Sequence, residues 1–209
     1  MFHYDILESK LRPIVKGIDP SSGFPMTAIS SVTRKGKSMK LTEMFLADLE
    51  REIPASRRVL EQVPDGRFDW KPHEKSMPMG SLAMMVALMP EWLGMMIQMD
   101  ELDIAPKGGS SYKPTPMKTA GELVKGLEAA AEKGRAALKG TTDQHLMTHW
   151  KLLSGGKVMQ DSPRHVQIRD GVLNHWVHHR GQLSVYLRLA GAKVPWIYGP
   201  SSDEMPPMA

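Results

Sequence analysis

The sequence LNHWVHHRGQL, residues 173–183, places three of the chain's eight histidines within five positions. An α-helix turns by about 100° per residue, so His175 and His179 lie one turn apart on the same face, and His178 lies toward its margin. The apolar positions of the surrounding pattern fall on the side of His179, whereas Asp170 and Arg188 fall on the other side. The sequence therefore predicts a long amphipathic helix over about residues 163–190 whose buried face carries two imidazoles.

Three further stretches have apolar residues at helical spacing. They are Lys40–Val63, with Pro54 inside it, residues 79–100, and residues 118–139, with Thr119 as a candidate N-cap. In the second stretch Met85 lies near the centre of the apolar stripe. We expect a short helical piece over Thr142–Trp150, a turn or small hairpin over Lys151–Asp161, and a loop over residues 101–117. With no convincing strand pattern, the fold class is predicted as all-α, a four-helix bundle, although the long connections leave the order of its helices open.

The N-terminal residues differ from the rest of the chain. Residues 1–38 show no sustained periodicity and carry six basic against three acidic residues, and Met39 directly precedes the first helical pattern. We expect residues 39–209 to form the domain, with residues 1–38 as a poorly ordered extension or a mis-assigned start. A short helix docked on the domain is the alternative.

The composition of the chain excludes several kinds of site and partner. The chain has no cysteine, which excludes disulfides, thiolate metal ligands and a cysteine nucleophile. No apolar run reaches transmembrane length and no signal-peptide pattern opens the chain, so we expect a cytoplasmic protein with no membrane partner. The net charge of +4 resides mostly in residues 1–38, and a nearly neutral remainder argues against a nucleic-acid partner.

Several stretches resemble the DinB family, the damage-inducible-type four-helix bundle metalloproteins that include thiol S-transferases. The resemblance covers about residues 39–204. It is carried by Asp69–Met77, Leu82–Trp92, Trp150–Lys157, Leu173–Arg188 and Val194–Glu204. It implies an up-down-down-up bundle, a homodimer, and a zinc or nickel site with one histidine from the second helix and two, four apart, from the last. The last pair matches His175 and His179, whereas the first position is Met85.

The Met85 position weakens the expected metal site. Two imidazoles four residues apart on a helix can chelate a divalent cation. A thioether, however, is a soft donor that suits Cu(I) better than zinc or nickel. We therefore expect the metal ligands to be His175 and His179, and the cofactor, zinc or nickel, to be bound weakly or not at all.

The histidine pair and the resemblance lead to two hypotheses for the function. The first is a DinB-type metal-dependent enzyme, a thiol S-transferase or hydrolase with a degenerate site, acting on an unknown small molecule. The alternative is a non-enzymatic dimeric bundle that binds a small ligand or a protein partner. The other candidates are interpreted as structural: His145 and His149 as surface or hinge residues, His73-Glu74 as solvated loop, the methionines as core, and Arg180 and Gln182 as helix-contact or dimer residues pointing away from the histidines.

Overall fold

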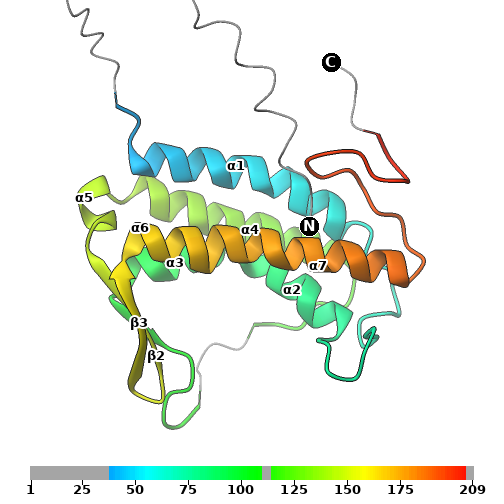
Figure 1. The fold of residues 1–209 in the computed structure, drawn as a ribbon, viewed down its shortest axis with the longest axis horizontal. Coiled ribbons are helices and arrows are strands. Elements are labelled where there is room, and N and C mark those ends of the chain that lie inside the picture. Colours follow the sequence, from blue (N-terminus) through cyan, green and yellow to red (C-terminus); the bar gives the residue numbers. More distant parts are fainter. Residues whose placement is uncertain (1–37, 110–113, 206–209) are drawn as a thin grey trace, which may run out of the picture. The chain divides into compact units, whose positions relative to one another are not determined.

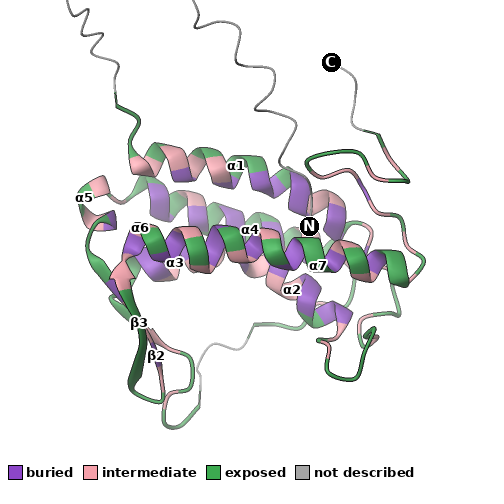
Figure 2. Cartoon of the chain, viewed as in Figure 1, coloured by how far each residue is buried: buried purple, intermediate pink, exposed green. Residues whose placement is uncertain are grey.

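Helices make up most of the chain that the computed structural model describes, residues 38–109 and 114–205 (Figure 1). In chain order they are α1 (Leu41–Leu60), α2 (Met79–Leu88), α3 (Glu91–Gln98), α4 (Ala120–Lys139), α5 (Asp143–Leu146), α6 (Arg164–Gln167), the π-helical η1 (Ile168–Asn174) and α7 (His175–Leu189). Each long helix is buried along one side and exposed along the other (Figure 2). The predicted N-terminal extension lies outside the described residues, apart from Ser38.

The predicted last helix is confirmed. Segments α6, η1 and α7 follow one another without a break from Arg164 to Leu189. Its predicted apolar face is buried at Ile168, Val172 and Leu183, while Asp170 and Arg188 are exposed. The π-helical turns in the middle were not predicted, and such turns occur frequently at functional sites.

The second predicted helix is two helices. Residues 79–100 break at Met89-Pro90, where α2 and α3 meet at a bend of 56°. Pro90 has no N–H for a helical hydrogen bond, so the helix starts anew behind it. Met85, expected near the centre of the buried stripe, is only half-buried, and Leu82, Ala83 and Val86 are among the buried residues of α2.

Among the described residues, no single helix is long and apolar enough to cross a membrane, although the bent pair α2–α3 meets that test by length and composition.

The predictions for α1 and α4 hold. Pro54 lies inside α1, in the region of the expected helix. At the start of α4, the Oγ1 atom of Thr119 accepts a hydrogen bond from the backbone N–H of Glu122. The Glu122 carboxylate in turn accepts one from the N–H of Thr119. This capping box satisfies backbone donors that a helix leaves free at its first turn.

A small sheet corrects the all-α prediction. Strands β1 (Glu101–Asp103), β2 (His149–Ser154) and β3 (Lys157–Pro163) lie in the order β1-β2-β3, with β1 parallel and β3 antiparallel to β2. The hairpin expected over Lys151–Asp161 is therefore confirmed, whereas Trp150 lies in β2 and not in a helix. Most of β3 is exposed, so its side chains lack the alternating apolar pattern by which strands are found. The fold is mostly helical with one small sheet, and the up-down-down-up bundle remains an interpretation.

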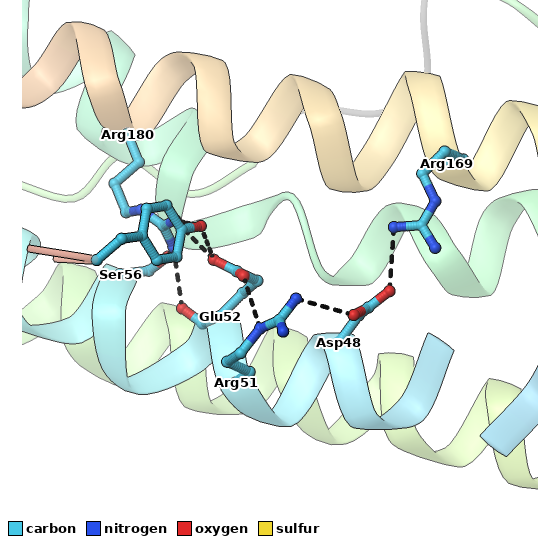
Figure 3. Close-up of polar contacts among 7 residues, drawn as sticks. Asp48, Arg51, Glu52, Ser56, Arg169 and Arg180 are labelled. Carbon is cyan, nitrogen blue, oxygen red and sulfur yellow. Dashed lines mark hydrogen bonds and ion pairs between the residues drawn. The ribbon is translucent and has the colours of Figure 1, made fainter. Parts of the chain in front are cut away.

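Two buried side chains fix α7 against the rest of the core. The indole N–H of Trp176 donates to the Val86 carbonyl at 2.8 Å and so fixes α7 against α2. The guanidinium of Arg180, 1% exposed, reaches α1, where it bonds the Glu52 carboxylate at 2.6 Å and the Ser56 hydroxyl at 3.1 Å (Figure 3). The Tyr198 hydroxyl contacts both Arg180 and Glu52. A charged pair this deeply buried is tolerated because Arg180 donates to several acceptors of α1 and the Glu52 carboxylate accepts from both Arg180 and Tyr198.

A second buried arginine ties the sheet to the helices. Arg164, also 1% exposed, donates to the carbonyls of Met96 at 3.1 Å and His149 at 2.7 Å. It also bonds the Met99 carbonyl and pairs with Asp100. One guanidinium therefore joins the C-terminal end of α3, the start of β2 and the start of the last helix.

The substitution Arg180→Ala is expected to lower the free energy of unfolding by about 3–5 kcal/mol, because it leaves the Glu52 carboxylate buried without its partner. Urea unfolding followed by circular dichroism measures the change. Arg169→Ala is the control, because it removes a half-exposed ion pair between η1 of the same long helix and Asp48 of α1 (Figure 3), and it is expected to cost at most about 1 kcal/mol. Equal losses in the two variants would contradict the assignment of Arg180 as the main polar contact of α7.

Candidate functional site

The two predicted histidines meet on the last helix. The Nε2 atoms of His175 and His179 lie 2.7 Å apart, and the ring centroids lie 4.4 Å apart. His179 is 8% exposed and His175 is half-buried. His178 is exposed, as its place at the margin of the face predicts. The structure therefore brings together the pair named from the sequence and leaves the third histidine in solvent.

The outer ring nitrogens also face acceptors. The Nδ1 atom of His179 lies 2.8 Å from the Oε1 atom of Gln182, and that of His175 lies 3.4 Å from the Gly171 carbonyl. Proton positions are assigned from these partners. His179 carries its proton on Nδ1 and donates it to Gln182, and its Nε2 lone pair accepts the Nε2–H of His175. If His175 moves its proton to Nδ1, toward Gly171, both Nε2 lone pairs become free and converge.

Gln182 corrects the sequence interpretation. It was expected to point away from the histidines, but its amide orients the buried ring of His179. The interpretation of Arg180 as a helix-contact residue is confirmed by its bonds to α1. Gln182 lies three residues after His179, within reach on a helix, and that i, i+3 spacing is the signal that could have found it.

Met85 lies in α2, the helix that packs against α7. Met85 precedes Val86, whose carbonyl bonds Trp176, the residue after His175, so the two backbones run side by side at this level. Met85 lines a small pocket of about 230 Å³ together with Trp92. The Trp92 ring in turn lies 6.0 Å from the ring of His175. Within residues 38–109 and 114–205, no group of three His, Cys, Asp or Glu side chains converges to hold a metal ion.

A pocket of about 470 Å³ opens beside His175. Its walls come from α3, β1, β2, β3 and the last helix. They are mostly apolar and aromatic: Trp92, Met95, Met96, Leu102, Ile104, Trp150 and Leu152, with His175, Gly171, Gln160, Gln167 and Asp103 as the remaining positions. This size and composition are typical of small-molecule sites. This pocket was not predicted from the sequence, because its walls combine α3 and the last helix with β1 and Trp150, which were not expected to lie in a sheet.

Burial lowers the pKa of His179 below its ordinary value of 6.5. The hydrogen bond to Gln182 raises this pKa by less than burial lowers it, and the neighbouring His175 and His178 lower it further. The ring is therefore neutral at pH 7, as the hydrogen bond between the two imidazoles requires. A neutral imidazole is also the form that binds a metal ion.

The other sequence candidates lie elsewhere. His145, at α5, contacts the Ile97 carbonyl at 2.8 Å, and His149, in β2, pairs with Asp161 at 2.7 Å. They do not share a helix face, so they form no chelating pair. His73 and Glu74 are exposed, and the Nδ1 atom of His73 accepts the backbone N–H of Lys75.

By its fold and its site, the protein is a mostly helical domain that carries a largely buried imidazole pair on its last helix. The family model described as DinB family matches residues 38–208, and the chain belongs to the DinB family.

Two solved structures share the fold. A DinB-like protein from Bacillus cereus ATCC 10987 matches with a TM-score of 0.59 and 20% identity, over 75% of this chain and 97% of that one. The DinB-like protein YjoA from Bacillus subtilis matches with a TM-score of 0.57 and 17% identity, over 74% of this chain and 97% of that one. The uncharacterized protein YrdA of Bacillus subtilis is 52% identical over 33 residues, which is 16% of this chain and spans a fifth of YrdA.

The pKa of His179 can be measured by NMR titration of the ring nitrogens in metal-free protein, and it is expected to lie below 6.5. Because the folded-state pKa is lowered, the unfolded chain takes up this proton first as the pH falls through about 6.5, so the free energy of unfolding falls between pH 7 and pH 5. A His179 pKa at or above 6.5 would contradict the neutral, hydrogen-bonded pair.

Proposed function

We propose that the chain is a metal-dependent enzyme of the thiol S-transferase or hydrolase type with a reduced metal site, in which His175 and His179 hold a zinc or nickel ion weakly. The observation that carries the proposal is the convergence of the two Nε2 atoms beside a pocket large enough for a small substrate.

The two imidazoles would supply two of the ligands of a metal site. Two nitrogens that share a cation at about 2.1 Å lie roughly 3.0 to 3.4 Å apart, so these Nε2 atoms, 2.7 Å apart, would have to separate by less than about 1 Å to hold one. Gln182 and the Gly171 carbonyl face the two Nδ1 atoms, which is how outer partners orient metal-binding histidines. The described residues supply no third His, Cys, Asp or Glu ligand, and Met85 offers only a thioether.

Each residue at such a site would have its own role. A bound divalent cation lowers the pKa of a neighbouring thiol or water and so makes it a nucleophile at neutral pH. Gln182 holds the His179 ring in place from its outer side. Trp92 packs near the His175 ring, and the apolar walls of the pocket exclude water from the body of the substrate. His175 lines the pocket itself, so a molecule held there lies next to the imidazole pair.

The second candidate is a non-enzymatic protein that binds a small ligand in the same pocket. It is favoured by Met85 at the position of the family's first histidine, and by the hydrogen bond that the two imidazoles can make with each other. In this case the histidine pair is a polar group at the pocket wall.

Calorimetric titration of EDTA-treated protein with Zn²⁺ and with Ni²⁺ separates the candidates. We expect one weak site per chain, with a Kd in the micromolar range or above, because two imidazoles provide fewer bonds than three. His179→Ala is expected to abolish this binding.

His178→Ala is the matched control, because it removes an exposed imidazole from the same helix and is expected to leave the titration unchanged. Submicromolar binding that depends on His179 would show an intact site and would contradict the reduced one. Equal binding in both variants, or none in the native chain, would overturn the metal-dependent proposal and favour the second candidate.

A further inference from the structure

The pocket beside His175 shares part of its lining with a second hollow. A groove of about 400 Å³ lies along β3 and the last helix, and Gln160, Gln167 and Gly171 line both the pocket and the groove. The two spaces are therefore adjacent across these three residues. Gly171 lies in the π-helical η1, and a Cβ added there would meet the Cε atom of Met96, a pocket residue, at 3.0 Å. The glycine thus leaves room at the junction.

The two hollows differ in chemistry. The pocket is mostly apolar, with two indole rings among its walls. The groove is mostly polar, and its remaining residues are Asp161, Ser162, Val166 and Asp170. A molecule that fills both spaces would place an apolar body between the aromatic walls of the pocket. Its polar end would lie in the groove, against β3 and the last helix.

The charges at the two hollows have one sign. Among the residues that the structure describes, those that line the two hollows include three carboxylates, Asp103, Asp161 and Asp170, and no lysine or arginine. Backbone N–H bonds, first from Ala105 and then from Gly156 and Gly155, lower the pKa of Asp103, so this carboxyl group stays ionised. Asp161 contacts the exposed ring of His149, and Asp170 accepts a hydrogen bond from the Asn174 amide. Neither contact supplies a permanent positive charge.

We infer that the pocket and the groove form one site for an elongated small molecule with an apolar body and a positively charged or neutral polar end, and that the site disfavours molecules ending in a carboxylate. The inference names the substrate class of the site proposed above and so rests on that proposed function. Its physical basis is hydrophobic burial of the body together with the carboxylates that face the other end.

Three matched probes test the charge preference: phenylbutylamine, phenylbutanol and phenylbutanoate, which share one ring and one chain length. Their binding to metal-free native protein in EDTA is measured by tryptophan fluorescence, because Trp92 and Trp150 line the pocket. At low ionic strength we expect the amine to bind about tenfold tighter than the acid, with the alcohol between them, and we expect salt to reduce the difference.

Two pairs of variants locate the site. Asp161→Asn combined with Asp170→Asn is expected to bring the amine to the affinity of the alcohol, whereas Asp65→Asn, at an exposed turn outside both hollows, leaves the series unchanged. Gly171→Leu is expected to weaken all three probes by about tenfold or more, because it fills the junction. Gly181→Leu is its control, since a Cβ at this exposed position of the same helix meets nothing within 4 Å. Circular dichroism checks that each variant is folded.

Equal or tighter binding of the acid, no fluorescence response to any probe, or equal effects of Gly171→Leu and Gly181→Leu would overturn the inference. Because the probes are measured without metal, the outcome is independent of the cation titration. If the three probes bind equally well to a chain that binds Zn²⁺ through His179, the inference is wrong and the metal-dependent proposal stands. If the amine binds tighter than the acid to a chain that binds no cation, the metal-dependent proposal is wrong and the inference stands.

Discussion

The buried ion pair between Arg180 and Glu52 is the contact on which the candidate site depends. It connects α7 to α1 one residue after His179, at a place where both charged groups are almost fully out of solvent. Since such a pair is tolerated only with its hydrogen bonds intact, it fixes the rotation of α7 about its own axis. That rotation turns His179 inward and leaves His178 in solvent. Trp176 adds a second fixed point, on α2, one residue after His175.

This rotation accounts for the chemistry of the imidazole pair. A buried imidazole without partners would be costly, and the structure meets that cost with a chain of contacts from His175 to His179 to Gln182. The same contacts leave the two Nε2 atoms facing each other, ready to share a cation once one proton moves. The same two imidazoles can hydrogen-bond to each other or share a cation, and we expect the methionine at position 85 to decide how strongly a cation is held.

The last helix could be predicted from the sequence, and the pocket beside it could not. The spacing of His175, His179 and the apolar residues around them is a local property, so it identified the buried face of the last helix. The walls of the pocket depend on contacts between distant residues. Strand β1 pairs with β2 about 50 positions later along the chain, and Arg164 fixes this arrangement through backbone carbonyls that no side-chain pattern reveals. The break at Pro90 was visible in the sequence, but its 56° bend, which brings Trp92 close to His175, follows from packing.

The central claim is that two imidazoles make a metal site that lacks its third ligand. Its most direct test is elemental analysis by mass spectrometry of the native chain and of Met85→His, purified side by side without added metal. The account predicts well below one zinc or nickel ion per native chain and about one per chain in Met85→His, because a histidine at position 85 completes a three-nitrogen set. One tightly held metal ion per native chain would contradict it.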